Sequence, residues 1–156
     1  MTFQDIIGNK TTKETLVNVV KNNKVLHGYM FIGQEGIGKF LIAKEFAKMI
    51  LCENKNVTPC NNCKSCLEFE GENNPDFSII KPDGNSIKIE QIRNMNSKIL
   101  EKPINSGRKV YIIDDSNKMT KEAQNCLLKT LEEPPEYAVI ILICNRRRFT
   151  FNNNKV

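Results

Sequence analysis

The sequence predicts an α/β protein built on a parallel β-sheet with flanking helices. Short apolar runs alternate with longer segments of helical period, and a glycine-rich stretch joins the first apolar run to the helix that follows it. The chain has 156 residues, of which 40% are hydrophobic and 26% charged, as is usual for a globular protein. This length suits one domain with a core of its own.

The first half of the chain contains the first strand and two helices. Residues 11–24 predict an amphipathic helix, with Thr11 and Glu14 at the spacing of a capping box. The nearly continuous apolar run 28–33 predicts a strand buried on both faces. Residues 39–52 keep a helical period, so strand, glycine-rich loop and helix follow one another as a phosphate-binding loop requires.

The second half repeats the alternation of strands and helices. Apolar runs predict three strands, at residues 76–81, 108–115 and 137–144. Amphipathic segments between them predict helices at residues 89–102 and 121–133. Thr120 can cap the second of these helices, and proline ends both.

The stretch GQEGIGKF, residues 33–40, matches all but the last position of the phosphate-binding pattern G-x-x-x-x-G-K-[ST]. Gly33, Gly36, Gly38 and Lys39 are therefore the candidate nucleotide-binding residues, since backbone N–H groups at a helix N-terminus attract phosphate. Phe40 stands where a hydroxyl would ligate Mg²⁺ and has no oxygen to offer. We predict a degenerate loop that binds ATP and Mg²⁺ weakly at most; a plain strand-to-helix turn is the alternative.

Two acids, Asp114 and Asp115, end the apolar run 108–115. This resembles the Walker B strand of ATPases, in which one acid orients Mg²⁺ and its neighbour polarises the attacking water. In active enzymes of that type the second acid is usually Glu, and Asp115 is one methylene shorter. We predict a degenerate site with no active catalytic residue. The alternative is a strand end whose carboxylates are solvated or cap the next segment.

Four cysteines lie within fifteen residues, at Cys52, Cys60, Cys63 and Cys66. In a cytosolic protein such clustering favours a metal over disulfides. Four thiolates can close a tetrahedron around Zn²⁺, so we predict a structural zinc loop at residues 52–66. An iron–sulfur cluster and free thiols are the alternatives.

Charge and hydropathy exclude several function classes. The net charge is +5, but residues 145–156 carry three Arg, one Lys and no acid, which leaves the body near neutral and indicates no basic groove. No apolar run approaches the roughly 20 residues of a membrane span, and no secretory signal is seen, so a cytoplasmic protein is expected. His27 is the only histidine, and we expect it to be hydrogen-bonded at a strand entrance. Cys126 and Cys144 lie in apolar patterns and are expected to be core thiols.

Five segments together resemble one family, the bacterial DNA polymerase III clamp-loader AAA+ subunits. They are HGYMFIGQEGIGK, PCNNCKSC, NPDFSIIKPDGNSIKIEQIR, KVYIIDDSNKM and LLKTLEEPP, and the resemblance covers about residues 3–145. CLLKTLEEPPE is the segment most specific to clamp loaders, and IIKPDGNSIKIEQIR resembles the delta-prime subunit. Gamma/tau subunits, by the resemblance, differ there and carry a complete GKT or GKS loop.

The resemblance implies an AAA+ subunit that supports the DNA polymerase III clamp loader without hydrolysing ATP itself. Its implied partners are the gamma/tau and delta subunits, with the sliding clamp and primer-template DNA reached through the complex; no membrane is implied. Two alternatives stay open: a gamma/tau-type ATPase and a stand-alone zinc-containing nucleic-acid binder. Phe40 disfavours the first, and the near-neutral body disfavours the second.

The chain departs from the family pattern after its fourth predicted strand. Residues 1–145 are interpreted as a truncated clamp-loader domain that lacks the final strand, the sensor residue and the Ser-Arg-Cys arginine finger. The first strand should then have an unpaired edge. Residues 146–156 form a basic tail unlike the family, and a frameshift is our hypothesis for it; a genuine short paralogue is the alternative.

Overall fold

The computed structural model describes residues 6, 8–54 and 58–145. In this part of the chain, four strands form one sheet: β1 (Gly28–Ile32), β2 (Phe77–Ile80), β3 (Lys109–Ile113) and β4 (Ala138–Cys144). The strand order is β1-β4-β3-β2, and every neighbouring pair is parallel. The predicted parallel α/β architecture is confirmed.

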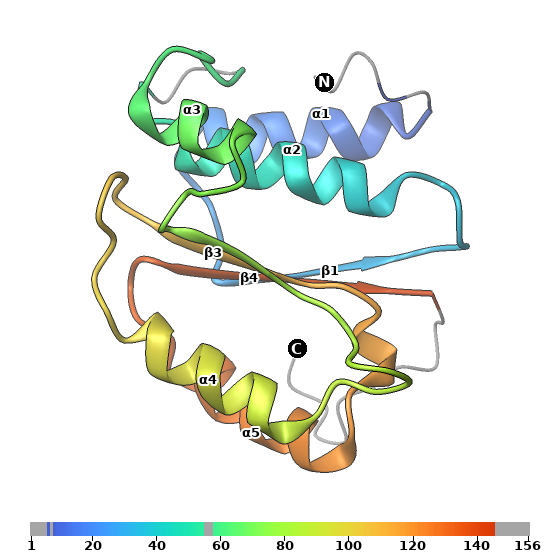
Figure 1. Cartoon of the computed structure of the whole chain (residues 1–156). Coiled ribbons are helices and arrows are strands. Elements are labelled where there is room, and N and C mark those ends of the chain that lie inside the picture. The colour runs from blue at the N-terminus through green and yellow to red at the C-terminus, as the bar shows by residue number, and fades with distance from the viewer. Residues whose placement is uncertain (1–5, 7, 55–57, 146–156) are drawn as a thin grey trace.

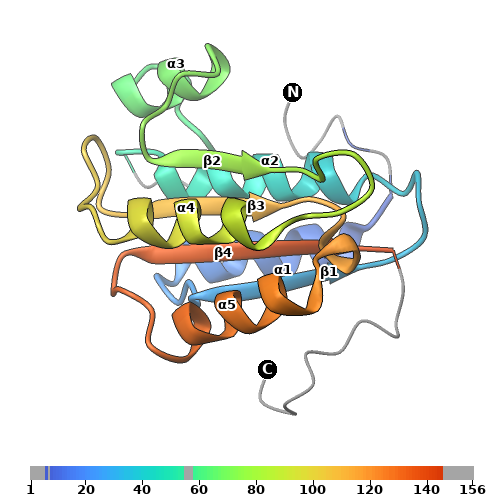
Figure 2. The ribbon, with the colours of Figure 1, turned by 60° about the horizontal axis from the view of Figure 1, so that its bottom comes forward.

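Helices cover both faces of the sheet, as Figure 1 shows. One face carries α1 (Lys10–Lys21), α2 (Lys39–Leu51) and α3 (Lys64–Glu70); the other carries α4 (Ile89–Ile99) and α5 (Lys121–Glu132). Figure 2 shows α4 and α5 lying side by side in front of the sheet. None of the described helices is long and apolar enough to cross a bilayer.

The core has two halves, one on each face of the sheet. Along β3, Val110 and Ile112 contribute to the cluster beneath α2, whereas Tyr111 and Ile113 contribute to the cluster beneath α4 and α5. The same alternation runs along β4, and both strands are buried throughout. Their continuous apolar sequences reflect this, because a central strand between two helix layers has no solvent-facing side.

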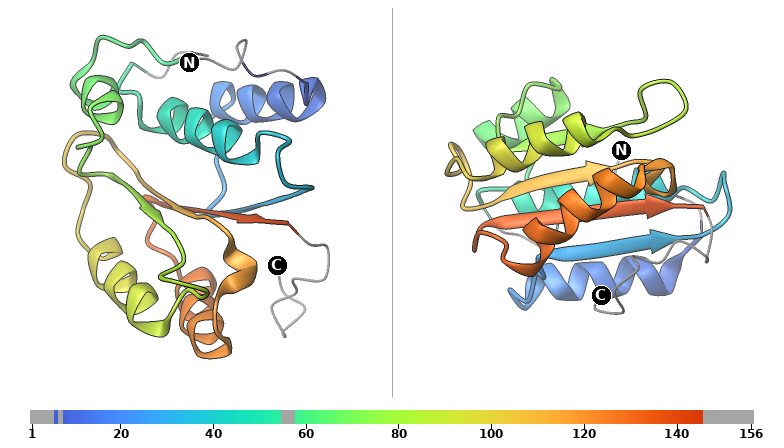
Figure 3. Two further views of the ribbon diagram at one scale, coloured as in Figure 1. Left: turned by 45° about the vertical axis from the view of Figure 1, so that its right-hand side comes forward. Right: turned by 90° about the horizontal axis from the view of Figure 1, so that it is seen from below.

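The prediction that β1 is buried on both faces is wrong. β1 lies at an edge of the sheet with β4 as its neighbour; its middle residues are half-buried, and Gly28 and Ile32 are exposed. An apolar run indicates a strand but does not say whether other strands will flank it on both sides. Among the described residues, β1 has no strand on its outer side, as the family resemblance led us to expect (Figure 3).

Of the two predicted helix N-caps, one is confirmed and one is wrong. Thr120 caps α5, since its hydroxyl accepts a hydrogen bond from the N–H of Ala123 at 3.1 Å. The capping box predicted at Thr11 is wrong, because α1 begins at Lys10 with Asn9 as its N-cap and no side-chain capping bond. Asn9 adopts φ 55° and donates its side-chain amide to the carbonyl of Ile37 at 3.0 Å. That tertiary bond ties the start of α1 to the glycine-rich loop.

The single histidine and the two outlying cysteines lie outside the loop and the cysteine cluster. His27 Nδ1 lies 2.9 Å from the carbonyl oxygen of Ala138, which confirms the predicted hydrogen-bonded position at a strand entrance. Cys144 is buried in β4, as predicted. Cys126 is only half-buried, and its Sγ lies 3.3 Å from the donating amide of Asn96.

Candidate nucleotide-binding cleft and cysteine cluster

A cleft of about 380 Å³ lies at the carboxyl ends of the strands. The loop contributes Gly36, Gly38, Lys39 and Phe40 to its lining, and the end of β3 contributes Asp114 and Asp115. In open parallel sheets this edge is where ligands usually bind. The structure therefore brings the predicted loop and the predicted acids together.

Backbone conformation requires glycine at two positions of the loop. Gly36 and Gly38 have φ values of 86° and 87°, in the left-handed region that other residues rarely adopt. Gly38 is the N-cap of α2, so the free N–H groups of the first helical turn begin directly after it. A Cβ on Gly33 would meet the Cδ1 tip of the exposed Ile37 side chain, which can turn away, so space does not require glycine there.

The ammonium group of Lys39 folds back onto its own loop. Its Nζ donates to the carbonyl oxygens of Gly33 at 2.5 Å and Gln34 at 3.1 Å, and to Oδ1 of Asn145 at 2.6 Å. A phosphate entering the cleft would have to compete with these three oxygens for the ammonium. The positive charge is in the position expected of a P-loop lysine, but it is already hydrogen-bonded.

Asn145 is a site residue that the sequence analysis missed. Its Oδ1 accepts the bond from Lys39, and its Nδ2 donates to Oδ1 of Asp115 at 3.3 Å, so one side chain joins the loop to the acids. Asn145 follows β4, which lies between β1 and β3 in the sheet. The available signal was a polar residue directly after an uninterrupted apolar strand.

The two acids at the end of β3 have different surroundings. Partial burial, followed by the nearby charge of Asp115, raises the pKa of Asp114 above its ordinary value. The N–H of Asp115 donates to Oδ1 of Asp114 at 3.0 Å, which opposes that shift. Asp115 has φ 49° and lies 3.9 Å, Oδ2 to Nζ, from Lys118. Both carboxylates border the cleft, as a Walker B-like pair should.

Phe40 puts an aromatic ring at the position of the magnesium-binding hydroxyl. The ring packs partly against the core cluster beneath α2, and the Nζ of Lys81 lies 5.5 Å from its centroid. Lys81 directly follows β2, and the carbonyl of its neighbour Ile80 accepts a hydrogen bond from the N–H of Asp114 at 2.9 Å. The cleft offers Mg²⁺ the carboxylate oxygens of Asp114 and Asp115, but the loop has no hydroxyl oxygen at position 40. The residues therefore fit this ion poorly.

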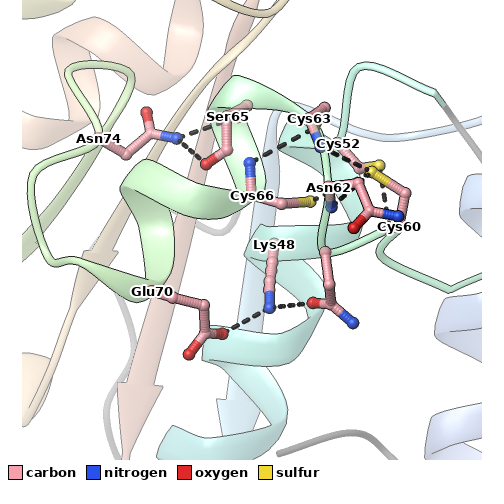
Figure 4. Close-up of polar contacts among 10 residues, drawn as sticks. Lys48, Cys52, Cys60, Asn62, Cys63, Ser65, Cys66, Glu70 and Asn74 are labelled. Atoms are coloured by element: carbon pink, nitrogen blue, oxygen red, sulfur yellow. Dashed lines mark hydrogen bonds and ion pairs between the residues drawn. The ribbon is translucent and has the colours of Figure 1, made fainter.

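The four predicted metal ligands do converge. The Sγ atoms of Cys52, Cys60, Cys63 and Cys66 all lie within 4.8 Å of one another (Figure 4). The sulfurs of Cys60 and Cys66 are 3.9 Å apart. A zinc–thiolate tetrahedron with bonds of about 2.3 Å has edges of about 3.8 Å, so this cluster fits a structural metal site.

Local backbone structure holds the sulfurs in place. Cys52 is the C-cap of α2, and Cys63 is the N-cap of α3, with its Sγ accepting a bond from the N–H of Cys66 at 3.4 Å. The N–H groups of Asn62 and Cys63 both donate to the sulfur of Cys60, and these bonds lower the pKa of Cys60 to about 6. Burial raises the pKa of the Cys66 thiol. The sequence analysis missed α3, since it treated this region only as a loop.

A buried lysine fastens the cysteine loop to the rest of the protein. The Nζ of Lys48, on α2, donates to Oε1 of Glu70 at 2.5 Å and to Oδ1 of Asn61 at 2.6 Å. The amide of Asn74 donates to the carbonyl and hydroxyl oxygens of Ser65, which holds the start of α3 (Figure 4). The sequence predicted none of these contacts.

These features together define a class of protein: an AAA+-like α/β domain with a candidate nucleotide cleft and a four-cysteine insert. Comparison with known proteins identifies the family. The family model described as "DNA polymerase III, delta subunit" matches residues 8–150. The chain belongs to the DNA polymerase III clamp-loader subunit family, as its N-terminal AAA+ region.

Similar curated proteins include two kinds of clamp-loader subunit. The chain is 37% identical over 128 residues to the delta' subunit of Bacillus subtilis, covering 82% of this chain and 39% of that protein. It is 40% identical over 141 residues to the tau subunit of the same species, covering 90% of this chain and 25% of that protein. It is 38% identical over 143 residues to the tau/gamma subunit of Haemophilus influenzae, covering 90% of this chain and 20% of that protein. The chain thus spans well under half the length of these relatives, and the identities do not separate delta' from gamma/tau.

Solved structures show the same fold. A gamma subunit-related protein of Thermotoga maritima superposes with a TM-score of 0.57 at 29% identity, covering 86% of this chain and 39% of that one. The RuvB Holliday junction branch migration motor of Thermotoga maritima superposes with a TM-score of 0.53 at 15% identity, covering 92% and 40%. The second likeness is one of fold alone, and it supports the AAA+-like architecture.

Proposed function

We propose that this chain is a delta-prime-like, non-hydrolysing subunit of the DNA polymerase III clamp loader. It acts as a structural AAA+ component in loading the sliding clamp during DNA replication. Its proposed partners are the gamma/tau and delta subunits, and it meets the clamp and primer-template DNA through the complex in the cytoplasm. One observation carries the proposal: Phe40 occupies the hydroxyl position beside Asp114 in the cleft.

The chemistry of the cleft supports binding without turnover. Mg²⁺ would have to be held by Asp114, water and phosphate alone, since Phe40 offers no oxygen. Asp115 is shorter than the Glu usual for water activation. Lys39 and the free N–H groups after Gly38 can still hold phosphate. Weak nucleotide binding at most is therefore expected, with little stabilisation of a charged transition state.

The cysteine cluster supports a structural role for Zn²⁺. All four sulfurs face one another, so a bound ion would have no position left for a substrate. The cluster ties α2 to α3 at the side of the sheet and does not border the nucleotide cleft. Elemental analysis separates zinc from the iron–sulfur alternative.

The proposal is tested by phosphate release and by co-purification. The chain and its Phe40→Thr variant are assayed for ATP hydrolysis, and the product of the whole locus is purified with gamma/tau and delta subunits. Release at background level together with co-purification supports the proposal. Sustained release by the unaltered chain would instead support the second candidate, a gamma/tau-type ATPase, which the 40% identity to a tau subunit favours.

We also propose that residues 1–145 are the clamp-loader domain and that residues 146–156 are not part of the family pattern. The described sheet and helices, which end with β4 at Cys144, support the first boundary, whereas the family model matches as far as residue 150 and so includes the first residues of the tail. The tail lies outside the described residues. Sequencing the locus tests the frameshift hypothesis, and an in-frame tail with no downstream Ser-Arg-Cys coding would reject it.

A further inference from the structure

We propose that the outer edge of β2 is a docking site for an extended segment of a partner protein, which pairs with β2 as a further strand and carries acidic side chains. The inference goes beyond the proposed function and does not depend on what the candidate nucleotide cleft binds. Three features of the described residues carry it: main-chain groups that point outward from β2, an apolar groove beside them, and two lysines at one end of that groove.

β2 has main-chain hydrogen-bonding groups that point away from the sheet. It is the last strand in the order, with β3 as its neighbour and, among the described residues, no strand on its other side (Figure 2). The carbonyls of Asp76 and Ile80 accept hydrogen bonds from β3 and from the residue after it, both at 2.9 Å. Main-chain groups alternate in direction along a strand, so the N–H and C=O of Ile79 point away from β3. An edge of this kind can pair with another extended chain.

A groove of about 320 Å³ lies beside this edge. Its apolar lining is Phe69 of α3 with Phe77 and Ile79 of β2, and the ring centroids of Phe69 and Phe77 are 4.5 Å apart. Phe77 and Ile79 both pack against the core cluster beneath α2, so the groove opens on that face of the sheet. A strand paired with β2 would send every second side chain to the same face, and the groove has room there for an apolar one.

The groove is positively charged at one end. Lys44 and Lys81 line it together with one acid, Glu72, which precedes β2 and so lies toward the other end. Phe40 and Lys44 are one turn apart on α2, and the Nζ of Lys81 lies 5.5 Å from the centroid of the Phe40 ring, so the two lysines lie near each other. Within the described chain, neither lysine makes an ion pair within 4.0 Å. A partner segment should therefore carry an acidic side chain where it passes the carboxyl end of β2.

The test begins with a displayed library of random peptides of about ten residues, the upper length of an ordinary strand, selected on this chain. The selected peptides should alternate apolar and polar residues and be rich in Asp and Glu. The strongest binder is then synthesised and titrated against the chain and its variants. In the wild-type complex, pairing should slow hydrogen exchange at the amide of Ile79, because that N–H becomes hydrogen-bonded.

A proline substitution tests the main-chain pairing. Ile79→Pro should weaken peptide binding by about tenfold or more, because it removes an outward N–H and puts a ring at the edge without removing a bond to β3. Met30→Pro is the matched control at the opposite edge of the sheet. There His27 and Gly33 bond to β4, so by the same alternation the N–H of Met30 points away from β4, and affinity should not change.

A charge substitution tests the acidic character of the partner. Lys81→Gln should weaken binding by about two- to fivefold, as expected for an exposed ion pair. Lys102→Gln removes the same charge from an exposed residue after α4 and should have no effect. Thermal melts check that each variant is folded.

Four results would overturn the inference. They are a selection that enriches no peptide, which would mean that the lysines only protect the edge from pairing; enriched peptides without acids; equal effects of the two proline variants; and unchanged exchange at the Ile79 amide in the wild-type complex. The last of these needs no variant.

Discussion

The ion pair between Lys48 and Glu70 allows a quantitative test of how the cysteine loop is held. The Lys48 side chain is 4% exposed, whereas the Glu70 side chain is 58% exposed. Removing the carboxylate leaves a buried ammonium with Asn61 as its partner, but removing the ammonium leaves a carboxylate that water can solvate. Glu70→Ala should therefore destabilise the protein more than Lys48→Met, although both break the same contact.

The two variants should differ by a measurable free energy of unfolding. Leaving a fully buried charge without its partner costs about 3–5 kcal/mol, and an exposed pair contributes about 0–1 kcal/mol. Because only the ammonium is buried and Asn61 remains, we expect about 1–3 kcal/mol for Glu70→Ala. Lys48→Met keeps the apolar stem and should cost about 1 kcal/mol or less. The double variant should resemble Lys48→Met, since no buried charge is left.

The effect should depend on pH in a defined direction. The hydrogen bond from Lys48 lowers the pKa of Glu70. A carboxyl with a lowered pKa in the folded state stabilises above its unfolded pKa, about 4.3 for Glu, and this contribution is lost as the pH falls through the lowered value. The difference between wild type and Glu70→Ala should be full at pH 7 and shrink toward pH 3. The pH series uses metal-stripped protein, because thiolate–metal binding itself weakens in acid.

Urea unfolding measures these differences. The matched control is the exposed pair Lys10–Glu14, whose side chains are 88% and 64% exposed, and Glu14→Ala should change stability by less than about 0.5 kcal/mol. A larger loss in Lys48→Met than in Glu70→Ala would refute the reasoning that the buried ammonium determines the cost. So would equal losses in Glu70→Ala and Glu14→Ala.

Three further predictions concern the metal, the acids and the core. Protein prepared reduced with zinc should hold one Zn²⁺ per chain, and Cys63→Ser should lower this content and increase hydrogen exchange in residues 52–70 while sparing the sheet; iron in the elemental analysis would contradict this. Asp114→Asn should raise the melting temperature more at pH 7 than at pH 3. A carboxyl whose pKa is raised on folding destabilises the protein once the pH exceeds both its unfolded pKa and its raised folded pKa. A change in melting temperature that is the same at both pH values would argue against the burial of Asp114. Ile112→Ala should cost about 2–5 kcal/mol in urea unfolding, since this side chain is fully buried, and a loss below about 1 kcal/mol would contradict the core described above.

Much of the candidate nucleotide cleft was predictable because its parts are local patterns. A strand, a glycine-rich loop and a helix occur in sequence order, so the motif itself places Gly38 and Lys39 at a helix N-terminus. The acids after β3 follow from the rule that parallel strands end at one edge of the sheet. Asn145 could not be placed in this way. Its role depends on β4 being inserted between β1 and β3, and that strand order is a property of the whole sheet.

The sequence by itself determined the α/β class, the degenerate loop and the four-cysteine cluster, because hydrophobic period, glycine spacing and cysteine spacing are local. Only the tertiary structure decided that β4 lies between β1 and β3, that Asn9 bonds to the loop in place of a capping box, and that Lys48 holds the cysteine loop. Each of these joins segments that are not adjacent in the chain. The energy of such a contact depends on how deeply the groups are buried and on which residue packs against them. Neither is specified by a residue's immediate neighbours in sequence.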